Sequence, residues 1–198
     1  MKGNVEEHLH ELFMSQWENF DDHFVMVWAE GLTVKETARR LGADLDTATE
    51  CALADLPPFE TGLHDIVTLI GEFGGWTLTL QVLMGDANRR EKMAALSAGG
   101  GRAVGIGWIN GDNHGVSVAA DGERVFSESI GEALRSGGLL ARHADGLSIP
   151  HVDDIPDDED YPEAAVVTTV LTAIGRLVGR QVDEEWLTAP HVAYLIRG

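Results

Sequence analysis

The stretch AVGIGWINGDNHGVSVAADGERVFS, residues 103–127, contains three β-prone runs separated by short turn sequences. The runs are Ala103–Ile109, Gly115–Ala119 and Arg124–Ser127. Gly111-Asp-Asn113 and Asp121-Gly122 lie between them. Because Asn, Asp and Gly tolerate the positive φ angles of tight turns, these signals predict antiparallel strands joined by hairpins.

Two further strands are predicted upstream of this stretch. Ile66–Ile70 and Trp76–Leu83 are rich in β-branched and aromatic residues, and Gly71, Gly74 and Gly75 lie between them. Such runs on either side of a glycine turn indicate an antiparallel pair. The five runs together predict an antiparallel β-meander of about five strands. Phe24–Ala29 could form another strand, and so could His191–Ile196.

Helical periodicity marks both ends of the chain and several short segments between them. One apolar stripe runs from Val5 to Phe20, and a second runs from Val166 to Val178, where Gly179 ends it. Shorter helices are predicted over Val34–Leu41 (with a capping box of Thr33 and Glu36, and closed by Gly42), Asp46–Leu53, Arg89–Leu96 and Asp183–Leu187. The expected fold class is therefore α+β, an antiparallel β-meander flanked by N-terminal and C-terminal helices.

The bulk composition is that of a globular protein. The chain has 198 residues, of which 44% are hydrophobic, so we expect a single domain spanning residues 1–198. No apolar run approaches the roughly 20 residues that cross a bilayer, and no secretory signal pattern is present, so a cytoplasmic location is expected. Cys51 is the single cysteine, which excludes an internal disulfide.

The chain is strongly acidic. Its formal charge is −19, with 33 acidic residues against 14 Lys and Arg. Eight of the acids lie between Asp145 and Glu163, within a proline-containing segment that we expect to be a flexible connection over about 143–163. Such a charge repels nucleic acids and anionic membranes, and it favours cationic protein partners.

One segment resembles a DNA-binding helix-turn-helix in its spacing. Leu32–Ala43 would supply the first helix, and the predicted Asp46–Leu53 helix would be the recognition helix. That second segment carries Asp46 and Glu50 and no basic residue, whereas a recognition helix must place donors against phosphates and bases. A structural helical hairpin beside the sheet is the alternative interpretation.

No pattern of residues identifies a catalytic or metal site. His8, His10 and Glu11 are close in sequence, but positions 8 and 10 of a helix point in different directions, and His151 with Asp153 and Asp154 matches no specific ligand motif. Gly99–Gly101, Gly105 and Gly107 do not match a phosphate-binding loop. We therefore expect no catalytic residue, no metal and no cofactor.

Three short motifs are spread over most of the chain. They are Val27–Thr33 (VWAEGLT) leading into Glu36–Gly42 (ETARRLG), Gly74-Gly-Trp76, and Leu171–Gly179 (LTAIGRLVG) before Leu187. In these motifs the chain resembles an uncharacterised family of small actinobacterial proteins, a domain of unknown function. The resemblance implies a bacterial source and a glycine-tryptophan strand at the centre of the fold. It implies no activity, cofactor or catalytic residue, and the long acidic connection departs from the family's pattern.

Charge and the lack of a catalytic pattern favour a non-enzymatic protein-binding module, such as an inhibitor or immunity-type protein that occludes a cationic partner surface. The expected contact residues are acidic: Asp153, Asp154, Asp157, Asp158, Glu159 and Asp160. Two alternatives remain open. One is a small-molecule-binding protein or enzyme with a cleft between sheet and helices, and the other is a subunit of a larger assembly.

Overall fold

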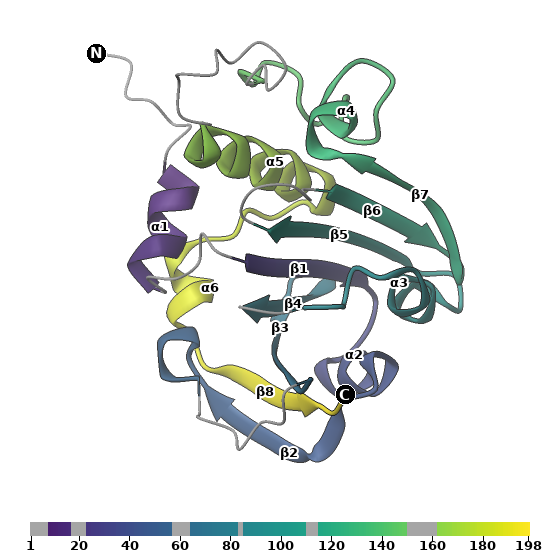
Figure 1. Ribbon diagram of the computed structural model, residues 1–198, viewed down its shortest axis with the longest axis vertical. Helices are drawn as coiled ribbons and strands as arrows, with labels where there is room; N and C mark the ends of the chain where they lie inside the picture. Colours follow the sequence, from purple (N-terminus) through teal and green to yellow (C-terminus); the bar gives the residue numbers. More distant parts are fainter. Residues whose placement is uncertain (1–7, 17–22, 57–63, 83–84, 110–114, 150–161) are drawn as a thin grey trace.

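The computed structural model describes residues 8–16, 23–56, 64–82, 85–109, 115–149 and 162–198. Within these ranges the chain forms one eight-stranded sheet in the order β2-β8-β3-β4-β1-β5-β6-β7, with every neighbouring pair antiparallel (Figure 1). The strands are β1 (His23–Glu30), β2 (Asp44–Cys51), β3 (Ile66–Phe73), β4 (Trp76–Val82), β5 (Arg102–Ile109), β6 (Gly115–Ala120), β7 (Glu123–Ser129) and β8 (His191–Ile196). The helices are α1 (His8–Gln16), α2 (Val34–Leu41), η1 (Leu53–Asp55), α3 (Arg90–Ser97), α4 (Ile130–Leu134), α5 (Glu163–Val178) and α6 (Glu184–Thr188).

β1 lies in the middle of the sheet and is buried on both faces. It pairs with β4 on one side and with β5 on the other. Phe24–Ala29 are all buried, and their side chains alternate between two separate core clusters. A strand that is buried on both faces has a continuous apolar sequence rather than an alternating one. The apolar run Phe24–Ala29 therefore suits the central position of the sheet.

The prediction of a five-stranded meander is wrong in strand number and order. The β3–β4 hairpin and the β5–β6–β7 hairpins form as expected, but β1 separates β4 from β5. At the other side, β8 and β2 extend the sheet beyond β3. Sequence neighbours pair readily through tight turns, yet burial of both faces of Phe24–Ala29 decides which strand fills the centre. The coarser prediction, α+β with antiparallel strands, is confirmed.

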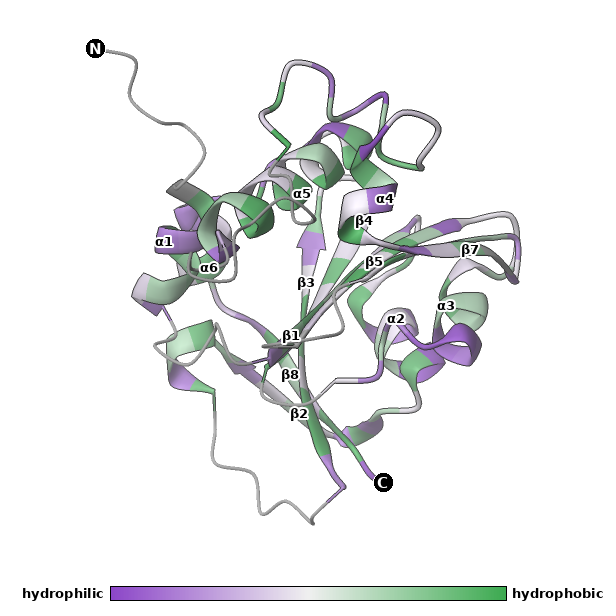
Figure 2. Cartoon of the chain, turned by 45° about the horizontal axis from the view of Figure 1, so that its top comes forward, coloured by the Kyte–Doolittle hydropathy of each residue, from purple (hydrophilic) through white to green (hydrophobic). Residues whose placement is uncertain are grey.

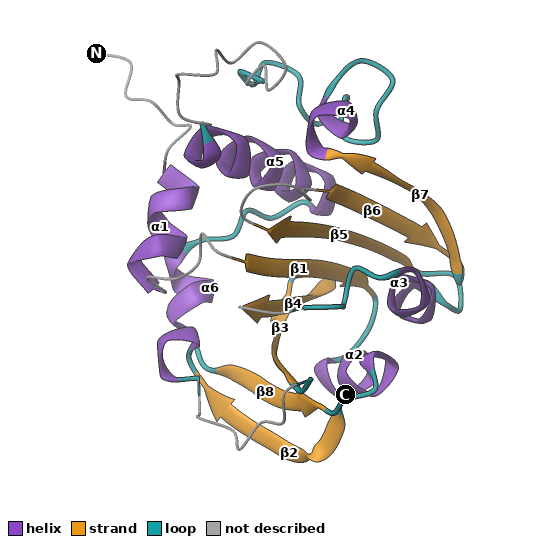
Figure 3. Ribbon diagram, in the orientation of Figure 1, coloured by secondary structure: helices purple, strands orange, loops and turns teal. Residues whose placement is uncertain are grey.

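Helices cover both faces of the sheet (Figure 3). One core cluster joins Phe24, Met26 and Trp28 to residues of α1, α4, α5 and α6. The other joins Val25, Val27 and Ala29 to residues of α2 and α3. Figure 2, which views the sheet close to edge-on, separates α1, α5 and α6 on one side from α2 and α3 on the other. No helix of the described ranges combines the length and the apolarity needed to cross a bilayer.

α2 has the bounds that the sequence predicts. The Thr33 side chain accepts a hydrogen bond from the Glu36 backbone N–H, and Gly42 closes the helix with φ +79°. The Glu36 carboxylate does not complete the predicted capping box, because it binds the guanidinium groups of Arg39 and Arg40 instead. These hydrogen bonds, that of Arg39 first, lower the pKa of Glu36 to about 2.

The predicted helix Asp46–Leu53 is wrong, because Asp44–Cys51 forms the edge strand β2. Thr47 and Thr49 are β-branched residues that suit a strand, and the Thr47 Oγ1 accepts a hydrogen bond from the Leu195 backbone N–H of β8 at 2.9 Å. Asp44 accepts a bond from the Asp46 N–H, so the apparent capping signal belongs to a bend within the strand. Both the helix-turn-helix and the helical hairpin are therefore excluded.

The C-terminal elements agree with the sequence predictions. α5 begins three residues before the predicted stripe and ends at Gly179, which has φ +82°. α6 and the added strand β8 follow. Between α4 and α5, residues 135–149 form successive turns that bury Leu140 and Ala144. The remainder of the predicted acidic connection, residues 150–161, lies outside the described residues.

Candidate functional site

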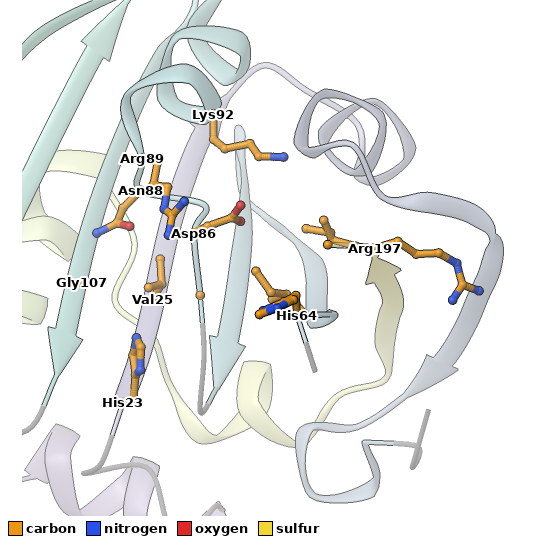
Figure 4. Close-up of a pocket in the computed structure, with 13 residues that line it drawn as sticks. His23, Val25, His64, Asp86, Asn88, Arg89, Lys92, Gly107 and Arg197 are labelled. Atoms are coloured by element: carbon orange, nitrogen blue, oxygen red, sulfur yellow. The ribbon is translucent and has the colours of Figure 1, made fainter. Parts of the chain in front are cut away.

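A cavity of about 670 Å³ lies on the α3 side of the sheet (Figure 4). Its walls come from the start of β1, the loop that precedes α3, the first turn of α3, one residue of β5, the start of β3 and the end of β8. Figure 4 shows Asp86, Lys92 and His64 facing a common space, with Arg197 extending away from it. The lining residues are His23, Val25, His64, Ile66, Gly85, Asp86, Asn88, Arg89, Lys92, Gly107, Ile196, Arg197 and Gly198.

The loop before α3 is held by a buried glutamine. Gln81, on β4, is fully buried, and its Oε1 accepts hydrogen bonds from the backbone N–H groups of Asp86 at 2.8 Å and Ala87 at 2.9 Å. A Cβ at Gly85 would stand 2.7 Å from the Val25 Cγ2, so the loop approaches the sheet too closely for any larger residue. Gln81 and Gly85 thus fix the position of Asp86.

Two glycines of β5 make room for the same loop. A Cβ at Gly107 would stand 2.4 Å from the Asn88 Nδ2, and one at Gly105 would stand 3.3 Å from the Asn88 Cβ. The Asn88 side chain therefore packs directly on the strand backbone. The sequence pattern of Gly105 and Gly107 resembles no phosphate loop, and their role is to admit Asn88.

The cavity gathers positive charge in an acidic protein. Lys92 donates from Nζ to the Leu41 carbonyl at the end of α2. Arg197 lies 3.4 Å from the Asp44 Oδ2 and 3.8 Å from the Asp65 Oδ2. Arg89 is exposed and forms no ion pair or side-chain hydrogen bond with the described residues. One strong cation at this site is therefore unneutralised.

Asp86 is the acidic group of the cavity lining. Its Oδ1 is buried and has no hydrogen-bond partner among the described residues, and the Gln81 Nε2 is in the same condition. Buried polar atoms are normally paired by protein, water or ligand. Asp86 thus lines the cavity without a hydrogen-bond partner for its carboxylate among the described residues, and the Gln81 Nε2 is an unsatisfied donor at the base of the same loop. Within the described residues, no group of three or more His, Cys, Asp or Glu is arranged to hold a metal ion.

The site residues that the sequence predicts are not among the described residues. Asp153, Asp154, Asp157, Asp158, Glu159 and Asp160 all fall within residues 150–161, outside the described residues. The cavity residues were missed because they come from five separate segments. One local signal was available: Arg89, Arg90 and Lys92 place three of the 14 basic residues within four positions, two residues after Gly85-Asp86.

Comparison with known proteins gives no match: no family model, no curated protein and no solved structure is significantly similar to this chain. The site must therefore be interpreted from its own geometry.

A second feature is the buried His191 at the start of β8. Its Nε2 lies 2.6 Å from the Trp186 carbonyl, and its ring stacks on that of Trp186 with centroids 4.2 Å apart. It covers Gly71 of β3, where a Cβ would stand 2.3 Å from the His191 Nδ1. Burial lowers the pKa of His191, and nearby Arg180 lowers it further against the opposing hydrogen bond to Trp186. His191 is a structural contact between α6, β8 and β3.

The lowered pKa of His191 predicts a loss of stability at mildly acidic pH. Between the folded pKa and the ordinary value of 6.5, the unfolded chain binds more protons, so the free energy of unfolding falls as the pH drops below 6.5. Denaturant melts of the parent and of His191→Gln from pH 7.5 to 5 measure this slope. We expect a shallower slope in His191→Gln than in the parent; equal slopes for the two proteins would contradict the assignment.

Proposed function

We propose that this protein binds a small polar molecule in the cavity between the sheet and α3. The observation that carries the proposal is that two charged groups without a partner among the described residues, the Arg89 guanidinium and the Asp86 carboxylate, line one cavity. The Arg89 guanidinium is exposed, so an anionic ligand would replace its hydration with charge-assisted hydrogen bonds. The Asp86 carboxylate can accept a hydrogen bond from the same ligand.

Size and construction support the proposal. The cavity volume of about 670 Å³ falls within the usual range for small-molecule sites, which is roughly 300–1,000 Å³. Gln81 holds the Asp86 loop through two backbone hydrogen bonds, so the acceptor is fixed before a ligand arrives. The proposal assigns binding and assigns no reaction.

A pair of cavity-filling variants tests it. Ile66 lines this cavity, whereas Val192 lines a smaller one on the same side of the sheet, and both are half-buried. Thermal unfolding of the parent, Ile66→Trp and Val192→Trp would be measured against a library of neutral, cationic and anionic metabolites. A ligand at about ten times its Kd should raise the parent's Tm by about 3–6 °C.

We expect Ile66→Trp to lose this ligand-induced shift and Val192→Trp to keep it. The proposal fails if no library member stabilises the parent, or if Ile66→Trp responds as the parent does.

Charge supports a second proposal, the acidic protein-binding module. The formal charge of −19 and the eight acids between Asp145 and Glu163 would speed encounter with a cationic protein. We expect the contact to be made by Asp153, Asp154, Asp157, Asp158, Glu159 and Asp160. Their combined replacement by Asn and Gln should then abolish the co-purification of a partner at low salt. Co-purification that survives both this replacement and high salt would refute the electrostatic mechanism.

We also propose that the protein belongs to the actinobacterial family of unknown function and that it is located in the cytoplasm. The three sequence motifs support the first. In the fold they fall on β1 with α2, on the turn into β4, and on α5.

A further inference from the structure

The charges that line the cavity oppose the charge of the whole chain. Arg89, Lys92 and Arg197 supply three positive groups, and Asp86 supplies the one carboxylate side chain of the lining. In the complete sequence, acids outnumber Lys and Arg by 33 to 14. Positive groups gathered in a recess attract anions from an otherwise repelling surface. The local sign of charge therefore indicates the sign of the ligand.

Two of the cations keep donors that no described residue uses. Both come from the start of α3: Arg89 precedes the helix as its N-cap, and Lys92 lies in the first turn. Arg197 is already paired with Asp44 and Asp65. Lys92 uses one of its three N–H donors on the Leu41 carbonyl, and Arg89 has all its donors left among the described residues.

Asp86 adds a requirement that a simple anion does not meet. Although it lies three residues before Arg89, it forms no ion pair with Arg89 or Lys92. The Asp86 carboxylate has no hydrogen-bond partner among the described residues, and a carboxylate can accept hydrogen bonds but cannot donate them. A ligand group that binds this carboxylate must be a donor, that is, a hydroxyl or an amine N–H.

Resting on the proposed function, we propose that the ligand is a small organic anion that also carries a hydrogen-bond donor. Its carboxylate or phosphate group binds Arg89, with Lys92 as a second cation of the same lining, and its hydroxyl or amine donates to the Asp86 carboxylate. The cavity volume of about 670 Å³ has room for a molecule of several carbon atoms.

Calorimetric titration with six probes tests the ligand class. Three probes carry both an anionic group and a hydrogen-bond donor. They are glucose 6-phosphate (phosphate and hydroxyls), gluconate (carboxylate and hydroxyls) and glutamate (carboxylates and an amine). Glucose lacks the anion, inorganic phosphate lacks the organic donor, and spermidine is a cation. We expect at least one of the first three to bind about tenfold or more tightly than all of the last three, since a charge-assisted contact is worth about that factor.

Matched variants assign the two contacts. Arg89→Ala should weaken the best probe at least about tenfold, whereas Arg90→Ala, which alters an exposed arginine outside the cavity, should not. Asp86→Ala should weaken the same probe while leaving the affinity for inorganic phosphate unchanged, and Glu91→Ala serves as its control. All four changes alter exposed or half-buried side chains, so their folding can be verified by thermal melts.

Failure of this inference is distinguishable from failure of the proposed function. If the library contains ligands that stabilise the parent but not Ile66→Trp, and these ligands are neutral or cationic, the cavity is a binding site and the proposed ligand class is wrong. If Arg89→Ala and Arg90→Ala weaken the best probe equally, the anion contact is also wrong. If no molecule of any class binds, both proposals fall.

Discussion

The Gln81→Met variant should be about 2–4 kcal/mol less stable than the parent, because two backbone N–H groups, one buried and one part-buried, lose their acceptor at a cost of about 1–3 kcal/mol each. Those donors belong to Asp86 and Ala87, and the Gln81 Oε1 binds both. Methionine preserves the volume, so the loss reports the hydrogen bonds rather than a cavity. Removal of the unpartnered Nε2 offsets part of the loss.

Thr79→Val is the matched control for this variant. Thr79 is two residues away on the same strand and face, is fully buried, and has an Oγ1 without a hydrogen-bond partner among the described residues. Its replacement should leave the free energy of unfolding unchanged or slightly higher. Urea denaturation of the three proteins checks both expectations. Equal stabilities for Gln81→Met and Thr79→Val would show that Gln81 does not hold the cavity loop.

The second large effect is expected at Gly71, where alanine should cost about 1–3 kcal/mol or more through overpacking. The added Cβ would lie 2.3, 2.7 and 2.8 Å from three ring atoms of His191. The ring cannot easily withdraw, because it is held by the Trp186 carbonyl and stacked on the Trp186 ring. We expect the junction of β3, β8 and α6 to loosen.

Gly75→Ala provides the comparison, since nothing lies within 4 Å of a Cβ built at that turn position. It should alter the midpoint of urea denaturation little. Near-ultraviolet circular dichroism adds a local readout, because Gly71→Ala should change the signal of the buried Trp186. A Gly71→Ala protein as stable as Gly75→Ala would mean that His191 does not lie over β3 as described.

Local signals predicted most of the elements. Turn residues such as Asp121-Gly122 mark hairpins directly, and Gly42 and Gly179 end α2 and α5 because a left-handed residue closes a helix. The order of strands was not available from such signals. Phe24–Ala29 reads as a strand on its own, yet its partners β4 and β5 are selected by two-sided burial, which depends on helices from both ends of the chain.

The β2 segment shows a conflict between local and tertiary preference. Asp46 offered a helix-capping pattern, and the few apolar residues after it fit either structure. Pairing with β8 decided the outcome, because the edge of the sheet provides hydrogen bonds that an isolated short helix lacks. Propensity over eight residues is too weak to override such pairing.

The cavity was beyond sequence reasoning for a different reason. Its side chains are individually ordinary, and what distinguishes Asp86 and Arg89 is that neither side chain has a partner among the described residues, which is a property of the folded arrangement. The net charge instead favoured the acidic segment as the predicted binding site. A cluster of basic residues that interrupts an acidic chain, as at Arg89–Lys92, was the more informative signal.

Amide chemical-shift mapping of the ¹⁵N-labelled protein, with the best ligand from the titrations, tests whether this cavity is the binding site. We expect saturable shifts concentrated at Gly85–Lys92 and at the start of β1, and we expect Ile66→Trp to abolish them while Val192→Trp does not. Shifts that cluster away from α3, or that persist unchanged in Ile66→Trp, would contradict the assignment of this cavity as the binding site.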